Sequence, residues 1–117
     1  MNNEVLKITL EETFPYECTI VGDDALAKVI NSLENEESLT IHFAKGGNDF
    51  DYSTAIEILK IAGEIIKIAI PIITSVVAAF ERKALIAEIK RHLPTREAIL
   101  TDEQVTEIID KTIKNIK

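Results

Sequence analysis

The sequence predicts an α+β domain: a small, mostly antiparallel sheet with one short helix, one long apolar helix and a C-terminal amphipathic helix. Short segments of the N-terminal half alternate between apolar and polar residues, as half-buried strands do. A nearly continuous apolar stretch follows, and the C-terminal segment carries apolar residues at helical spacing. A chain of 117 residues is large enough for one domain with its own core. We divide it into an acidic strand–helix–strand part, 1–52, and a helical part, 53–117.

The N-terminal half contains three predicted strands and one predicted helix. Val5–Leu10 and Tyr16–Val21 both alternate between apolar and polar residues, which predicts two strands joined by a turn in a hairpin. Gly22, followed by two aspartates, ends the second strand and supplies an N-cap for a short helix over Ala25–Leu33. Leu39–Phe43 alternates again and predicts a third strand. The inward residues of the short helix are expected to be Leu26, Val29, Ile30 and Leu33.

The stretch Ser53–Phe80 predicts a long helix, over about 53–83 or longer, that is apolar around more than half of its circumference. An ordinary surface helix is apolar over a stripe roughly 100° wide. Thr54 and Glu57 have the spacing of a capping box at the helix start. Pro71 predicts a kink or an end to the first half of the helix. The polar residues fall on one line because the steps between them alternate three and four: Glu57, Lys60, Glu64, Lys67, Pro71, Thr74, Ala78 and Glu81.

The length of this helix raises a packing problem. The twenty-eight residues of Ser53–Phe80 would span about 42 Å at about 1.5 Å per residue. A compact chain of this size has a diameter of about 35 Å. We therefore expect a bend at Pro71, burial of the helix in an oligomer, or contact with a membrane.

The C-terminal third contains one ambiguous segment and one clear helix. Residues 84–100 fit a helix through Leu85, Ile86 and Ile89, but they also fit a β-hairpin in which Leu85, Ala87 and Ile89 alternate. Thr101 and Gln104 have the spacing of a capping box. The helix that follows carries an apolar stripe made of Val105, Ile108, Ile109, Thr112, Ile113 and Ile116.

The charge distribution limits the partners. The net charge is −7, and residues 1–52 hold eleven acids against three lysines, whereas residues 53–117 hold nine acids and ten bases. An acidic half argues against nucleic acid as a partner, because phosphate contacts dominate such binding. It suits a basic protein surface, and it also suits plain solubility. One cysteine and no secretory signal fit the cytoplasm. The longest charge-free run, Ile68–Phe80, is thirteen residues, short of the roughly 20 that span a bilayer.

The residue pattern predicts no catalytic, cofactor-binding or metal site. His42 and His92 lack the neighbouring ligands of a zinc site. Cys18 falls on an expected buried face and reads as a core thiol. The Gly-containing segment 45–47 lacks the spacing of a phosphate-binding loop. The basic residues after the long helix fit either a membrane-flanking cluster or the commoner role of complementing a helix C-terminus.

The order of these segments resembles one family of small domains. A strand leads to Val21-Gly22-Asp23-Asp24, a short helix, a third strand and a long Ile/Ala-rich helix that ends in Phe80-Glu81-Arg82-Lys83. This order, over roughly residues 4–100, is similar to the effector-associated constant component domains of bacterial conflict systems. The resemblance implies an α+β accessory module beside effector proteins, with a strand pair after the long helix, and implies no catalytic residues. The family's long helix carries several glycines and a tryptophan, whereas this chain has Gly63 and Phe80 there.

The sequence therefore predicts a non-enzymatic interaction module. We expect self-association, or binding of a partner protein, through one face of the long helix, made of Ile61, Ile65, Ile68, Ile72 and Val76. One alternative is an acidic inhibitor or immunity-type protein that blocks a basic site on an enzyme, with Glu34, Glu36 and Glu37 as test positions. Another alternative is a membrane-associating effector, although the charges on the long helix are costly in lipid.

Overall fold

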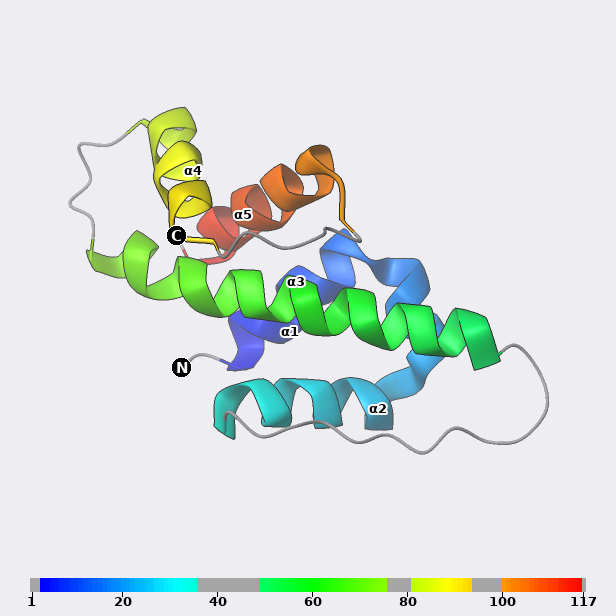
Figure 1. The fold of residues 1–117 in the computed structure, drawn as a ribbon. Coiled ribbons are helices and arrows are strands. Elements are labelled where there is room, and N and C mark those ends of the chain that lie inside the picture. The colour runs from blue at the N-terminus through cyan, green and yellow to red at the C-terminus, as the bar shows by residue number, and fades with distance from the viewer. Residues whose placement is uncertain (1–2, 36–48, 76–80, 94–99, 117) are drawn as a thin grey trace.

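The computed structural model describes residues 3–35, 49–75, 81–93 and 100–116, and every regular element within these ranges is an α-helix. The α+β prediction is therefore wrong for this part of the chain, which contains no strand. The molecule is elongated, 52 × 25 × 22 Å, and α3 runs along its length (Figure 1). The helices are α1 (Asn3–Thr13), α2 (Pro15–Asn35), α3 (Asp49–Ser75), α4 (Arg82–Arg91) and α5 (Asp102–Ile116).

The two N-terminal segments that were predicted to be strands are helical. In α1 the buried residues Val5, Leu6, Thr9 and Leu10 have helical spacing, and Ile8, which a strand would have buried, is 47% exposed. Tyr16, at the start of the second predicted strand, is 68% exposed for the same reason. An alternation of only three apolar residues, such as Leu6, Ile8 and Leu10, is compatible with a strand or with a short helix. The packing of α1 and α2 against the other helices decides between the two. The third predicted strand, Leu39–Phe43, lies outside the described residues.

The turn predicted over residues 11–15 is wrong in its extent, because residues 11–13 belong to α1 and Pro15 begins α2, so that Phe14 alone separates two helices. Phe14 is buried between α1 and α2, and its backbone N–H donates to the Leu10 carbonyl at 2.8 Å. Pro15 begins α2, a position where its missing N–H costs nothing. Within α2, Gly22 has φ +83° and ψ 166°, so the break predicted there is a kink between two helical halves. The four residues expected to face inward after the kink are all buried: Leu26, Val29, Ile30 and Leu33.

The long helix exists, with different ends and no break at its proline. It begins at Asp49, so Thr54 lies inside α3 and the predicted capping box at Thr54 and Glu57 is wrong. The helix continues past Pro71 as far as Ser75. Near this end, the Thr74 hydroxyl donates to the Pro71 carbonyl and the Ser75 hydroxyl to the Ile72 carbonyl, both at 3.2 Å. Its 27 residues span about 40 Å.

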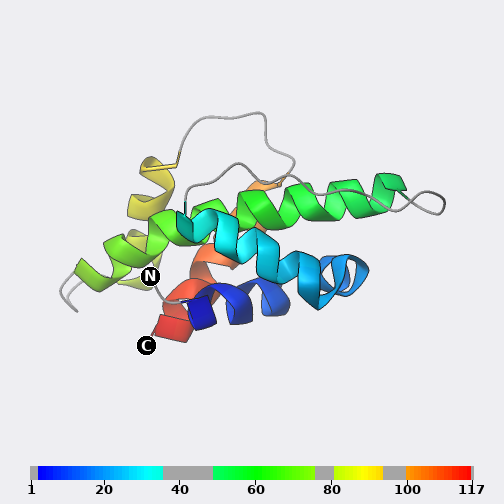
Figure 2. The ribbon, with the colours of Figure 1, turned by 90° about the horizontal axis from the view of Figure 1, so that it is seen from below.

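Four helices pack against α3 and bury one side of it. Helices α1, α2 and α5 lie along it, and α4 lies near its C-terminal end (Figures 1 and 2). In both views, no described helix covers the middle of the opposite side of α3. The described helices therefore cover one side of α3. The buried residues of α3 are Ala55, Ile56, Leu59, Ala62, Gly63, Ile65, Ile66, Ala69 and Ile73.

The segment 84–100, which fitted either a helix or a β-hairpin, is helical where the structure describes it as part of α4. Residues 82–91 form α4. The β-hairpin alternative and the strand pair implied by the family resemblance are therefore both wrong for residues 84–91. Residues 94–99 lie outside the described ranges. The predicted capping box before α5 is confirmed. The Thr101 backbone N–H donates to Gln104 Oε1 at 2.8 Å, and the Gln104 N–H donates to Thr101 Oγ1 at 3.1 Å. The predicted stripe of α5 faces the core, with Ile108, Ile109, Thr112 and Ile113 buried.

Candidate interaction surface

The outer side of α3 carries a strip of three isoleucines. Ile61, Ile68 and Ile72 are each half-buried, and their spacing of seven and four residues places them on one face. Ile61 and Ile72 also pack against the edge of the hydrophobic core. We call these three residues the isoleucine strip. Part of each of these side chains stays accessible among the described residues, so the strip is a partly exposed apolar surface.

The other two residues of the predicted partner surface lie elsewhere. Ile65 is only 7% exposed and belongs to the core. Val76 lies outside the described residues. The structure thus brings three of the five predicted residues together at the surface, with Ile65 beneath them.

A line of alternating charges borders the isoleucine strip. Glu57 is exposed, and Lys60, Glu64 and Lys67 are half-buried. Lys67 Nζ donates a hydrogen bond to the Leu33 carbonyl at 2.7 Å, which ties α3 to the C-terminal end of α2, where backbone carbonyls lack helical partners. The charge line therefore lies between α2 and the isoleucine strip on the surface of α3.

A close approach of α2 to α3 fixes this orientation. Gly63 is buried, and a β-carbon at this position would overlap Cδ1 of the buried Leu33. Residues two apart on a helix point in roughly opposite directions, about 200° from each other. Because Gly63 faces α2, Ile61 faces away from it. The small glycine thus helps to aim the isoleucine strip outward.

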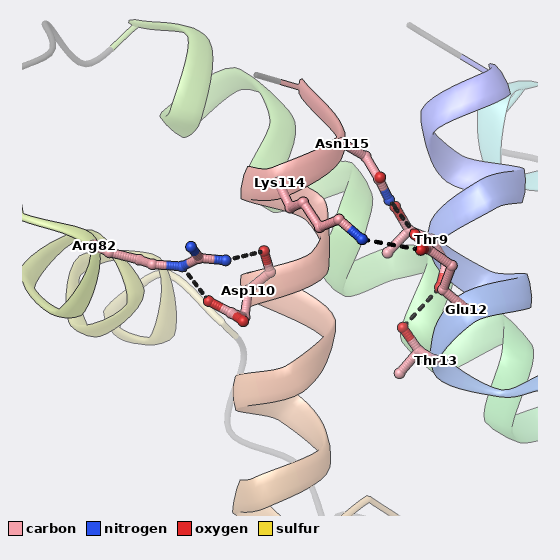
Figure 3. Close-up of polar contacts among 7 residues, drawn as sticks. All are labelled: Thr9, Glu12, Thr13, Arg82, Asp110, Lys114 and Asn115. Atoms are coloured by element: carbon pink, nitrogen blue, oxygen red, sulfur yellow. Dashed lines mark hydrogen bonds and ion pairs between the residues drawn. The ribbon is translucent and has the colours of Figure 1, made fainter.

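Polar contacts hold the remaining helices together (Figure 3). The Arg82 guanidinium contacts the Asp110 carboxylate and donates to the Asp110 carbonyl at 3.3 Å, which joins α4 to α5. Asn115 Nδ2 donates to Glu12 Oε1 at 2.8 Å, and Lys114 Nζ lies 3.3 Å from Glu12 Oε2, which joins α5 to α1. The hydrogen bond from Asn115, with Lys114 beside it, lowers the pKa of the Glu12 carboxyl. The contacts of Glu12 join residues about a hundred positions apart and that of Arg82 with Asp110 joins residues 28 apart, and no local sequence signal predicts them.

Two hollows lie between α1 and α2 and adjoin at Asp23. The first, about 350 Å³, is lined by side chains that include Glu4, Lys7 and Ile30. The second, about 480 Å³, lies beside the Gly22 kink and includes Glu11 and Cys18. Sequence reasoning missed both hollows because they depend on how the two helices pack. Their linings combine three acidic residues and one lysine with apolar and neutral polar side chains.

Cys18 and His92 are the thiol and the imidazole in the described part of the chain. Burial, followed by the nearby carboxylates of Glu11 and Glu17, raises the pKa of the Cys18 thiol to about 11, which disfavours the nucleophilic thiolate. His92, at the end of α4, lies 3.2 Å from Glu88 on the surface. Within the described ranges no group of three or more His, Cys, Asp or Glu residues could hold a metal ion. His42 and the glycine-containing segment 45–47 lie outside these ranges.

Neither a membrane-spanning helix nor a related protein is found for the described chain. Across the described residues, no helix has the length and apolar character needed to cross a bilayer. Comparison of the chain with protein-family models, with characterised proteins and with solved structures gives no match.

Proposed function

We propose that this chain is a non-enzymatic interaction module that pairs with a second copy of itself through the isoleucine strip of α3. The observation that supports this proposal is the outer side of α3. One side of the helix is buried in the hydrophobic core, whereas Ile61, Ile68 and Ile72 on the other side stay partly accessible. Contiguous apolar surface of this kind commonly marks a protein–protein contact.

The energetics suit a reversible dimer. A contact along α3 that buried about 600 Å² of apolar surface in total would contribute about 15 kcal/mol at about 25 cal/mol per Å². Association itself costs on the order of 4–15 kcal/mol. The remainder is about 0–11 kcal/mol, a range that includes the roughly 8 kcal/mol of a micromolar dissociation constant. We therefore expect a dimer that forms and dissociates over an accessible range of concentrations.

Two further observations are compatible with this role. A single cysteine with a raised thiol pKa suits a protein of the reducing cytoplasm. We also propose that the chain works beside another protein, the setting that the sequence resemblance to accessory domains of bacterial conflict systems implies; this part of the proposal does not rest on the fold, because the segments 5–10, 16–21 and 84–91 are helical and not the strands of that family. On this proposal the chain brings two copies together and performs no chemistry itself.

The test compares two isoleucine-to-glutamate variants that differ only in position. Ile68→Glu places a charge in the middle of the strip, and we expect it to raise the dimer dissociation constant at least about tenfold. Ile8→Glu changes the same side chain on the exposed face of α1, where Ile8 is 47% exposed, and we expect no effect. Sedimentation velocity across a concentration series measures both, with circular dichroism as a check on folding. Equal self-association of the two variants would contradict the proposal.

A second candidate function is an acidic inhibitor, favoured by the hollows between α1 and α2. Glu4, Glu11 and Asp23 line these hollows beside apolar side chains, a surface that suits a basic segment of another protein. Among the test positions, Glu34 accepts a hydrogen bond from Asn3 at 2.8 Å, whereas Glu36 and Glu37 lie outside the described residues. Charge reversal at Glu11 and Asp23 should abolish binding of a basic partner and leave self-association unchanged.

A further inference from the structure

The charges beside the isoleucine strip are arranged symmetrically about one point of α3. Glu57 and Lys67 are equally distant from residue 62, and so are Lys60 and Glu64. In each of these pairs the two charges have opposite signs. When two copies of a helix run antiparallel about that point, residues at equal distances on either side lie opposite each other. Glu57 of one copy then faces Lys67 of the other, and Lys60 faces Glu64.

The apolar residues share nearly the same centre. The half-buried Ile58 and Ile68 are equally distant from residue 63. The two centres differ by one residue, which is about 1.5 Å along a helix, so long charged side chains reach across the difference. One register therefore pairs Ile58 with Ile68 and acid with base at the same time.

Only an antiparallel pair uses this charge pattern. A two-fold axis perpendicular to the helices brings the same flank of both copies together, and the interface is self-complementary. The charge line lies on one flank of the isoleucine strip. In a parallel pair the two charge lines would lie on opposite sides of the dimer and could not meet.

We infer that two copies of this chain pair antiparallel along α3, with the two-fold axis near Ala62 and with Lys60 and Glu64 of each copy fixing the register. This inference rests on the proposed self-association and adds its geometry. In this arrangement Lys67 keeps its hydrogen bond to the Leu33 carbonyl within each copy. The central Lys60–Glu64 contacts occur twice by symmetry and carry most of the specificity.

The test uses two single charge reversals and their mixture. Lys60→Glu leaves two acids at the centre of each chain, and Glu64→Lys leaves two bases. Each variant alone meets like charges at both symmetry-related contacts, so we expect its homodimer to dissociate at least about tenfold more readily than the wild type. In an equimolar mixture the acidic chain meets the basic chain, and the dimer should recover to near the wild-type affinity. Contacts within one chain cannot produce this recovery, because neither chain has changed on mixing.

Lys28→Glu, on the exposed face of α2, is the matched control and should leave self-association unchanged. Circular dichroism of each variant checks that the helices are intact. A wild-type chain that stays monomeric would overturn the proposed function itself. A wild-type dimer whose two charge variants fail to recover on mixing would leave the proposed function standing and overturn the antiparallel register.

Distances between spin labels give an independent readout. In a Cys18→Ala background, labels at Ser53→Cys should lie about 27 Å apart along the helix axis in the antiparallel dimer, and labels at Ser75→Cys about 39 Å apart. A parallel dimer would place both pairs at a similar, short separation, near the distance of about 10 Å between packed helices. Similar distances at the two positions would overturn the inference.

Discussion

Substitution of Gly63 by alanine tests the close packing of α3 against α2, which sets the orientation of the isoleucine strip. Gly63 is buried where α3 meets the C-terminal end of α2. An alanine β-carbon would overlap Cδ1 of Leu33 and lie 3.6 Å from its Cγ. Leu33 is 6% exposed and therefore cannot move its side chain into solvent without losing core contacts. The two helices would have to separate, or Leu33 would have to adopt a strained rotamer.

Two opposing effects determine the size of the change. Alanine is favoured over glycine inside a helix by about 1 kcal/mol, whereas overpacking of a core costs about 1–3 kcal/mol. We expect Gly63→Ala to lower the free energy of unfolding by about 1 kcal/mol. In a Leu33→Ala background the overlap is gone, and the same substitution should raise the free energy of unfolding by about 1 kcal/mol. The change of sign corresponds to a coupling of about 2 kcal/mol between the two positions.

Urea unfolding followed by circular dichroism measures all four members of this cycle. Ser53→Ala is the control, because Ser53 is exposed on the same helix and gains helix propensity without any overlap. If Gly63→Ala stabilised the protein in both backgrounds by the same amount, α2 and α3 would not meet as described. The outward orientation of the isoleucine strip would then lose its support.

Three further predictions concern single side chains. Because the folded-state pKa of Glu12 lies below its ordinary value of 4.5, its stabilising effect is present above that pH and is lost as the pH falls through the folded-state pKa. Melting temperatures of the wild type and Glu12→Gln should therefore differ at pH 7 and converge in acid; a constant difference would refute this. Iodoacetamide should alkylate Cys18 of the folded protein with a midpoint near pH 11, and a midpoint near that of a free thiol would contradict the burial. Thr101→Ala, which removes the cap of α5, should cost about 1 kcal/mol in urea unfolding, and no loss relative to Thr106→Ala would refute the cap.

The sequence predicts correctly those helices and caps whose signal lies within a few turns of the chain, either as a long apolar periodicity or as a capping pair. The stripe of α5 and its capping box at Thr101 and Gln104 are confirmed, because both depend on residues within a few turns of each other. The apolar helix and the break at Gly22 are present for the same reason. The N-terminal strands failed because alternation over three apolar positions cannot be distinguished from a short amphipathic helix. Only the packing of α1 and α2 shows that Ile8 and Tyr16 face solvent.

The candidate surface is predictable in part. Helical spacing places Ile61, Ile68 and Ile72 together, and they lie together on α3. The same spacing cannot show that Ile65 is buried, because its burial depends on which helices pack beside it. The contact of Gly63 with Leu33, thirty residues earlier, depends in the same way on tertiary packing.

The central claim is that the outer side of α3 joins two copies of the chain. Sedimentation equilibrium of the wild-type protein over a wide range of concentrations tests this most directly. We expect the weight-average mass to rise from the chain mass of 13.0 kDa toward twice that value as the concentration passes through the micromolar range. A mass that stays at 13.0 kDa up to millimolar concentration would contradict the account.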